Sequence, residues 1–143
     1  MIGTTVQKRL AAVLAASALT LGTSLLVVGT ANASADSATC RTPDVYADGL
    51  TVHTCADWYD GSHITGTVHT SGTNRTIINL CIEIVDANQN LVPGSRDCQP
   101  VAGADGTVIT PPVSPAPGTY YAVSYFTSPT YWYGGESPAF NYS

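Results

Sequence analysis

Three histidines are the residues of this sequence whose type could bind a metal ion or transfer protons: His53, His63 and His69. His63 and His69 lie in one alternating segment, six residues apart, which corresponds to about 20 Å along a strand. Without a bend they cannot share one ion, and the sequence contains no HExxH or comparable motif. We interpret the histidines as solvent-facing strand residues, and we expect no metal site and no cofactor.

The carboxylates Asp57 and Asp60 flank Trp58 and Tyr59, which superficially suggests glycosidase chemistry. A glycosidase needs a deep cleft with a defined separation between its two carboxylates, and a small domain rarely builds one. The sequence also has no G-x-S-x-G elbow, and no serine stands in a context that suggests activation. We therefore expect that the protein is not an enzyme.

The amino-terminal segment has the features of an export signal. Lys8 and Arg9 precede an apolar stretch over 10–28, and Ala31-Asn32-Ala33 offers small residues where a signal peptidase reads them. These features predict a signal peptide over 1–33. The alternative is a transmembrane anchor, because the apolar stretch is near spanning length. Small polar residues dilute the stretch and no basic stop-transfer cluster follows it, so we expect a secreted, extracellular protein with no membrane association after cleavage.

The charge balance of the exported part argues against a nucleic-acid partner. Of the 143 residues, removal of 1–33 leaves 110, the size of one small domain. Arg41, Arg75 and Arg96 are the only basic residues in it, against ten acidic ones. Affinity for nucleic acid rests on Lys and Arg that neutralise phosphates. Solubility outside the cell explains the acidity.

Four cysteines lie in the exported part: Cys40, Cys55, Cys81 and Cys98. An even count in a short secreted domain indicates two disulfides. The cysteine spacings of 15, 26 and 17 residues supply no zinc motif. Three pairings are possible, and we predict the local one, Cys40–Cys55 with Cys81–Cys98.

The strongest strand signal covers 76–86, T-I-I-N-L-C-I-E-I-V-D, which alternates strictly between an apolar and a polar face. The apolar face carries Ile78, Leu80, Ile82 and Ile84. We expect this face in the core and Cys81 on the outer side of the sheet. Turn-forming residues follow at 87–90. A hairpin centred between Gln89 and Asn90 would place Cys81 opposite Cys98, at a separation that suits a disulfide.

Other alternating segments predict strands at 50–54, 63–70, 107–110, 118–126 and 137–142. We interpret 34–39 as a flexible N-terminal tail, 40–143 as a single domain, 56–61 and 127–135 as loops, and the proline-rich 111–117 as a connection between sheets. No segment after the signal has a helical period. Short strands separated by turn clusters predict an all-β, antiparallel β-sandwich.

The segment Pro117-Gly118-Thr119-Tyr120, directly ahead of an alternating strand, resembles the start of the sixth strand of immunoglobulin-like and fibronectin-type sandwiches. The segments 64–72 and 76–90 are similar to the second and third strands of bacterial extracellular immunoglobulin-like modules. This resemblance implies an immunoglobulin-like β-sandwich in which Tyr120 forms the tyrosine corner. The chain departs from antibody domains, because Ala122 stands where the second intersheet cysteine would be.

The main candidate binding residues are Tyr131, Trp132 and Tyr133, in the segment P-T-Y-W-Y-G-G-E-S. Tyr and Trp offer large contact areas at low entropy cost and are enriched in interface hot spots and antibody-like loops. If Tyr120 begins the sixth strand, these residues lie in a loop at one end of the sandwich. Alternatively, Trp132 folds back to cap the core. Trp58 and Tyr59 are a second aromatic pair, which would lie at either end.

These features favour a secreted, non-catalytic protein-interaction module whose partner is another secreted protein. In size, signal and two-disulfide character the chain is similar to the small adaptor subunits of actinobacterial umbrella toxin particles, which bridge a lectin-bearing stalk protein and a toxin-bearing protein. That resemblance implies contacts through 34–39 and Tyr131–Tyr133. One alternative is a carbohydrate-binding protein that stacks sugars on Trp132, Tyr131 and Trp58. Another is a protease or glycosidase inhibitor, although the Tyr131 segment is far in sequence from every cysteine.

Overall fold

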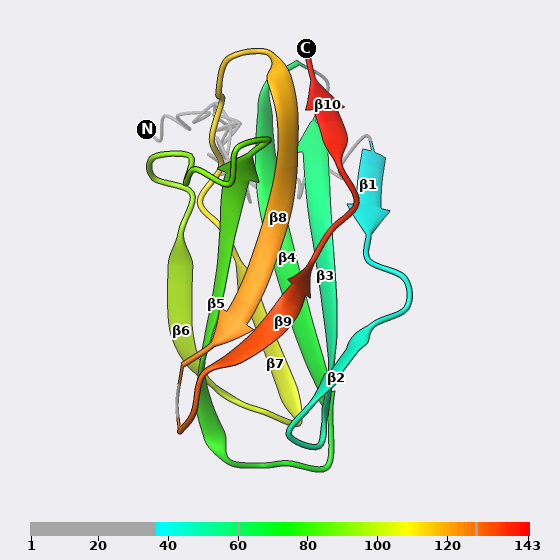
Figure 1. Cartoon of the computed structure of the whole chain (residues 1–143). Coiled ribbons are helices and arrows are strands. Elements are labelled where there is room, and N and C mark those ends of the chain that lie inside the picture. The colour runs from blue at the N-terminus through cyan, green and yellow to red at the C-terminus, as the bar shows by residue number, and fades with distance from the viewer. Residues whose placement is uncertain (1–36, 60, 128) are drawn as a thin grey trace, which may run out of the picture. The chain divides into compact units, whose positions relative to one another are not determined.

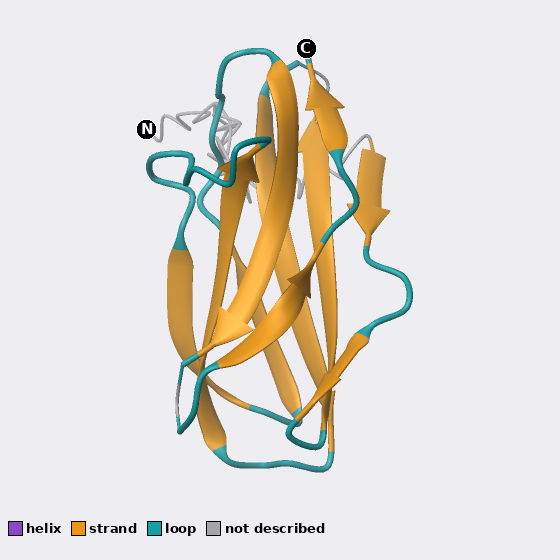
Figure 2. Cartoon of the chain, in the orientation of Figure 1, coloured by secondary structure: helices purple, strands orange, loops and turns teal. Residues whose placement is uncertain are grey.

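The computed structural model describes residues 37–59, 61–127 and 129–143. The predicted signal peptide, and residues 34–36 of the predicted tail, lie outside the described residues. All regular elements of the described part are strands (Figure 2). They are β1 (Ser37–Cys40), β2 (Val45–Ala47), β3 (Leu50–Tyr59), β4 (His63–Gly72), β5 (Ile77–Asp86), β6 (Asp97–Ala102), β7 (Asp105–Ile109), β8 (Gly118–Phe126), β9 (Trp132–Glu136) and β10 (Phe140–Tyr142). Within those ranges, no helix has the length and apolar character needed to cross a membrane.

The strands form two antiparallel sheets that pack face to face (Figure 1). In the first, here called sheet A, the order is β1-β3-β4-β7, and β2 also pairs with β3. In the second, sheet B, the order is β10-β8-β5-β6, and β9 also pairs with β8. This arrangement confirms the predicted all-β antiparallel sandwich, with the proline-rich segment connecting the sheets between β7 and β8.

The connectivity agrees with an immunoglobulin-like fold. Counted from β3, strand β4 is the second and pairs with the fifth, β7, in sheet A. Strand β5 is the third and pairs with the sixth, β8, in sheet B. Immunoglobulin-like sandwiches place these strand pairs together in the same way. Strands β1 and β2 are additions that extend the free edge of β3.

The core lies between the sheets and takes apolar side chains from both. The predicted inward face of β5 has no exposed surface at any of its four positions: Ile78, Leu80, Ile82 and Ile84. One polar contact also crosses the core. Thr54 Oγ1 on β3 lies 2.6 Å from Ser124 Oγ on β8, and both residues are fully buried. Because a buried hydroxyl is costly without a partner, this bond favours the alignment of the two sheets that keeps Thr54 opposite Ser124.

Both predicted disulfides are present, and each joins two residues that are directly opposite on neighbouring strands. Cys40 pairs with Cys55 between β1 and β3, and Cys81 pairs with Cys98 between β5 and β6. Each bridge fastens an outermost strand to its sheet, because β1 and β6 end the two strand orders. A closed loop of this length contributes about 3 kcal/mol in the chain-entropy account of disulfide stabilisation.

The prediction of a flexible N-terminal tail is wrong for residues 37–39, which form part of β1. Ser37 pairs with Trp58, and Thr39 pairs with Ala56. The bridge at Cys40–Cys55 explains the difference, because it sets the register from which the preceding residues continue the ladder. A polar, small-residue sequence gave no sign of this pairing.

Two predicted loops are also partly strands. Strand β3 extends to Tyr59, because β4 provides a partner for every residue of it up to the pair Tyr59 and His63. Strand β9 begins at Trp132, within the predicted loop 127–135, and pairs with β8. Its glycines suggested a loop, but Gly134 packs closely on Ser124, where an added Cβ would lie 2.5 Å from Ser124 Oγ.

The tyrosine corner expected from the sequence resemblance is present. Tyr120 is buried at the start of β8, and its hydroxyl donates a hydrogen bond to the carbonyl oxygen of Ala116, at 2.6 Å. The bond ties the proline-rich connection to the start of strand β8, four residues downstream, as in other sandwiches of this type.

The corner can be tested with Tyr120→Phe, which removes the donor and leaves the Ala116 carbonyl without its partner. We expect the free energy of unfolding to fall by about 1–3 kcal/mol. Urea unfolding followed by tryptophan fluorescence measures this change. Tyr121→Phe is the matched control, because Tyr121 is the next residue and faces outward. Equal losses in the two variants would show that the corner has no special role.

Candidate functional site

Three exposed aromatic residues, Tyr131, Trp132 and Tyr133, lie at β9, an edge strand of sheet B, and are here called the aromatic edge. Their exposed fractions are 62%, 40% and 46%. Tyr131 immediately precedes β9, and the other two are its first residues. These three predicted binding residues are therefore accessible, but Trp132 and Tyr133 lie on a strand that pairs with β8 and not in a free loop.

Trp132 caps the core and at the same time remains partly exposed, whereas the sequence presented a binding surface and a core cap as alternatives. Its ring stacks on Phe126, with centroids 6.4 Å apart and planes inclined by 30°. Phe126 is fully buried, so Trp132 covers this end of the core with one face. The rest of the ring faces solvent. Trp132 is a core cap with an exposed side that a partner can contact.

Tyr133 belongs to a row of side chains that crosses the outer face of sheet B. It is opposite Tyr125 on β8, Tyr125 is opposite Cys81 on β5, and Cys81 is opposite Cys98 on β6. Tyr131 packs against Tyr125, with ring centroids 5.9 Å apart. The aromatic edge therefore lies near a disulfide in space, although it is distant in sequence.

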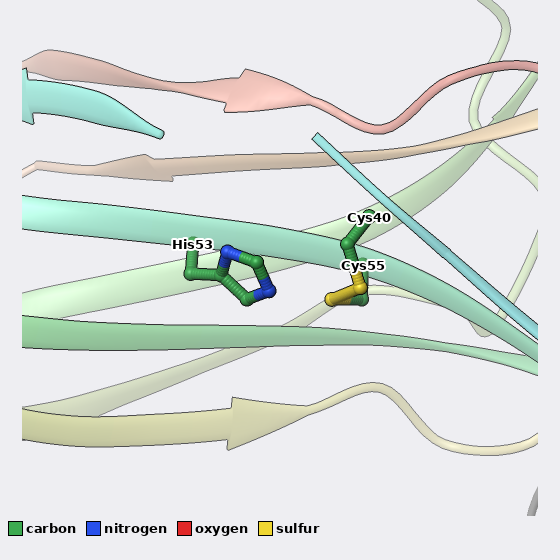
Figure 3. Close-up of side chains that lie close together, drawn as sticks. All are labelled: Cys40, His53 and Cys55. Carbon is green, nitrogen blue, oxygen red and sulfur yellow. A yellow bond between two sulfur atoms is a disulfide. The ribbon is translucent and has the colours of Figure 1, made fainter. Parts of the chain in front are cut away.

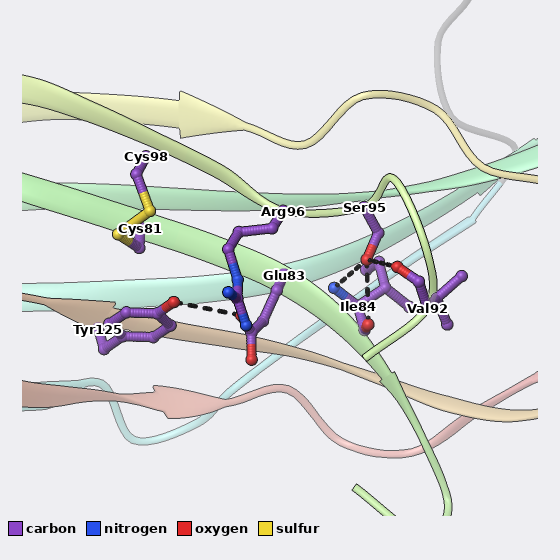
Figure 4. A network of polar contacts seen from close by, with 8 residues as sticks. All are labelled: Cys81, Glu83, Ile84, Val92, Ser95, Arg96, Cys98 and Tyr125. Atoms are coloured by element: carbon purple, nitrogen blue, oxygen red, sulfur yellow. Dashed lines mark hydrogen bonds and ion pairs between the residues drawn. A yellow bond between two sulfur atoms is a disulfide. The ribbon is translucent and has the colours of Figure 1, made fainter. Parts of the chain in front are cut away.

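A charged cluster fixes Tyr125 from the other side (Figure 4). Its hydroxyl donates to Glu83 Oε2 at 3.2 Å, and Arg96 Nε donates to the same oxygen at 2.6 Å. The hydrogen bond to Glu83 raises the pKa of Arg96. Desolvation, and secondarily the Glu83 charge, raises the pKa of Tyr125. Desolvation raises the pKa of Tyr133 also, with Glu136 as the next cause. Both phenols therefore stay protonated and neutral under ordinary conditions.

A pocket of about 300 Å³ adjoins the aromatic edge. It is lined by Arg41, Thr42, Tyr133, Glu136, Ser137 and Pro138. Arg41 Nη1 donates to the carbonyl oxygen of Glu136 at 3.4 Å. The Arg41 side chain lies over Gly135, which has a φ of +110° and where an added Cβ would be 2.8 Å from Arg41 Cδ. Glycine is thus required at 135 on both conformational and steric grounds.

Trp58 and Tyr59, the second predicted pair, lie away from the aromatic edge. Trp58 stacks on Phe140, with centroids 5.6 Å apart, and Tyr59 stacks on His63 at 4.2 Å. Phe140 is opposite Tyr120, whereas Trp132 is opposite Phe126. Those positions are six residues apart on β8, or about 20 Å. The pair Trp58 and Tyr59 and the aromatic edge therefore occupy opposite ends of the sandwich and form no joint patch.

A larger pocket, of about 460 Å³, lies beside the tyrosine corner. Its walls come from the β5–β6 connection, including Leu91 and Pro93, and from the proline-rich connection, including Val113 and Pro115. Sequence reasoning missed this pocket, although Pro93 and Pro115, one in each of the two connections, were a usable signal. Its volume is in the range of small-molecule sites.

The wall of this larger pocket is rigid because Asp86 organises the turn that follows β5. One Asp86 oxygen accepts from the amides of Asn88 and Asn90, at 2.8 and 2.9 Å, and the other accepts from Asn90 Nδ2 at 3.1 Å. These bonds, the two from Asn90 foremost, lower the Asp86 pKa. Buried Ser95 anchors the far side of the connection, with its Oγ 3.1 Å from Ile84 O and 2.8 Å from Val92 O (Figure 4).

Cys40, His53 and Cys55 place three potential ligand atoms, two sulfurs and one ring nitrogen, within 4.8 Å of one another (Figure 3). The two sulfurs form a disulfide, so neither is a thiolate and this group is not a metal site in the oxidised protein. Of the two carboxylates that suggested glycosidase chemistry, Asp57 accepts a hydrogen bond from Thr67 Oγ1 at 2.7 Å. Asp60 lies outside the described residues.

Comparison of the chain with protein families, with curated proteins and with solved structures found no match in any of the three. Its candidate sites are therefore argued from their own geometry.

The Asp86 turn makes a pH-dependent contribution to stability. Its carboxyl pKa is below the ordinary 3.8, so the stabilisation is complete above that value and is lost as the pH falls through the lower, folded pKa. We expect Asp86→Asn to be less stable than the native chain at about pH 7, and we expect this difference in the free energy of unfolding to shrink as the pH falls below 3.8 toward about 2. Urea titrations at both pH values measure the difference. The control is Asp105→Asn on the exposed edge strand β7; a pH-independent deficit in Asp86→Asn would contradict the role of this carboxylate.

Proposed function

We propose that the protein acts outside the cell as a non-catalytic interaction module that binds a secreted partner protein through the aromatic edge. The observation that carries this proposal is the exposure of three consecutive aromatic side chains that are fixed from behind. Phe126 supports Trp132, and Tyr125 supports Tyr131. Aromatic anchors held in one conformation lose little entropy on binding, which is what interface hot spots need.

The surroundings of the aromatic edge support a protein partner. The Arg41 pocket beside Tyr133 offers a guanidinium, a carboxylate and a hydroxyl next to the exposed rings. An apolar centre with polar groups around it is the usual anatomy of a protein interface. The two disulfides are consistent with an oxidising, extracellular setting for such a contact.

An adaptor role, as in the umbrella toxin particles that the chain resembles in overall form, would need a second contact surface in addition to the aromatic edge. The predicted second contact was the tail 34–39, of which Ser37–Thr39 is occupied in pairing with β3. The opposite end of the sandwich remains, where the larger pocket and Trp58 lie. Under this proposal a partner at each end would make the protein a bridge.

Carbohydrate binding is less well supported by the arrangement of the rings. Tyr133 is opposite Tyr125 on the outer face of sheet B, whereas Trp132 stacks on the core residue Phe126. Neighbouring strand residues point to opposite faces, so Trp132 and Tyr133 do not form one flat platform for a sugar ring. The position of the aromatic edge near Cys81 is also compatible with an enzyme inhibitor. In that case the captured partner would be a protease or a glycosidase.

The proposal is tested by purifying the affinity-tagged protein from culture supernatant and identifying co-purifying proteins by mass spectrometry. We expect a stable secreted partner. Tyr131→Ala and Tyr133→Ala should each weaken its binding by roughly tenfold or more, the effect of losing a hot-spot side chain. Tyr59→Ala, at the opposite end, is the matched control and should leave the affinity unchanged.

Other outcomes would count against this proposal. A clean monomer that binds chitin, cellulose or cell wall would replace it with the carbohydrate alternative. A partner whose binding is insensitive to Tyr131 and Tyr133 but lost in Tyr59→Ala would move the interface to the other end of the sandwich. Trp132→Ala is not suitable alone, because it also uncovers Phe126 and lowers stability.

A further inference from the structure

His53 and His69 lie directly opposite each other on the outer face of sheet A. They are a register pair between β3 and β4. Their neighbours Thr54 and Val68 are fully buried, so alternation turns both imidazoles outward. Directly opposed residues of antiparallel strands have Cβ atoms about 4.5–5.5 Å apart. Two imidazoles that start from this separation can reach one ion.

Each of these histidines has its Nδ1 next to an oxygen. His53 Nδ1 lies 2.5 Å from Asp44 Oδ1, and His69 Nδ1 lies 2.9 Å from Thr107 Oγ1. An ionised carboxylate can only accept, so Nδ1 of His53 is the nitrogen that carries the proton toward Asp44. The Thr107 hydroxyl can accept from His69 in the same way. In this state Nε2 of each ring has its lone pair available.

Metal-binding histidines usually have this arrangement. The ring nitrogen that does not bind the metal donates to a carboxylate or another oxygen, which orients the ring and raises the basicity of the binding nitrogen. Asp44 comes from the segment between β1 and β2, and the Cys40–Cys55 bridge holds this segment beside β3 (Figure 3). The disulfide sulfurs near His53 are not ligands, but they position the carboxylate that supports it.

We propose that His53 and His69 form a binding site for a divalent transition-metal ion that prefers imidazole, such as Zn²⁺, Ni²⁺ or Cu²⁺. Each ring binds through Nε2, Asp44 and Thr107 hold the Nδ1 atoms, and water completes the coordination. The side chains of His53 and Asp44 are each more than a third exposed, so an ion can reach the site without opening the fold. The excess of acidic residues in the chain also favours the approach of cations.

The site goes beyond the proposed protein-binding role and does not depend on it. It lies on sheet A, whereas the aromatic edge belongs to sheet B. His63 is no part of it, because His63 is opposite Tyr59 and its ring stacks on that tyrosine. It lies six residues from His69 along β4, which is about 20 Å. His63 therefore provides a matched internal control.

Isothermal titration of the oxidised protein, prepared without a polyhistidine tag, with ZnCl₂, NiCl₂ and CuCl₂ tests the site. We expect one ion per chain. His53→Ala and His69→Ala should each weaken binding by about tenfold or more, because a single imidazole remains. Asp44→Ala should weaken it by about 10–100-fold, the usual effect of removing such a support. His63→Ala should leave the affinity unchanged.

A second measurement locates the ion. Added Cu²⁺ should broaden the amide NMR signals of His53, His69 and Thr107 and leave those of His63 sharp. All four variants change exposed or half-exposed side chains, and matching NMR spectra without metal would establish that they fold. The absence of saturable binding would overturn the proposal. So would equal losses in His63→Ala and His69→Ala, or broadening centred on His63.

Discussion

Burial of the isoleucine face of β5 is the constraint on which the arrangement of sheet B depends. Ile82 and Ile84 pack against Gly66 of β4, where an added Cβ would lie 3.1 Å from each side chain. The sheets approach so closely here that no larger residue fits without displacement of its neighbours. A shift of one residue in the register of β5 would bring Cys81 and Glu83 into this space, which their polarity and the disulfide forbid. Because the inward face of β5 must stay buried, it also determines which side chains of β5 face outward.

The outward face of β5 then supports the candidate binding surface. Cys81 fastens β6, and Glu83 holds Tyr125 through the phenolic hydroxyl. Tyr125 in turn supports Tyr131. The exposed rings of the aromatic edge thus depend on a chain of contacts that begins in the core. A surface supported in this way is rigid without being part of the hydrophobic core itself.

The sequence was sufficient for those parts of the fold where polar turn residues mark the centre of a hairpin. Residues 87–90 mark the turn between β5 and β6. Counting residues outward from this turn along both strands places Cys81 opposite Cys98. The same count around the turn between Tyr59 and His63 pairs His53 with His69, but the composition of 56–61 predicts a loop and hides this hairpin. Strand β9 was missed because Gly134 and Gly135 indicate a loop by composition, whereas here they allow contact with Ser124 and Arg41. The place of Arg41 beside Tyr133 depends on tertiary packing, which no local pattern reveals.

The segment that follows Cys40 connects the two candidate sites. Arg41 extends to β9 and bonds to the Glu136 carbonyl next to Tyr133, while Asp44, three residues later, reaches His53 on the outer face of sheet A. The amide of Arg41 donates to the carbonyl of Thr54, which continues the β1–β3 ladder one residue past the disulfide. The Cys40–Cys55 bridge thus fixes the origin of a short segment that supplies a charged group to each sheet. Its role is therefore positional as well as entropic, because together with the pairing of β2 and β3 it holds Arg41 and Asp44 where each meets its sheet.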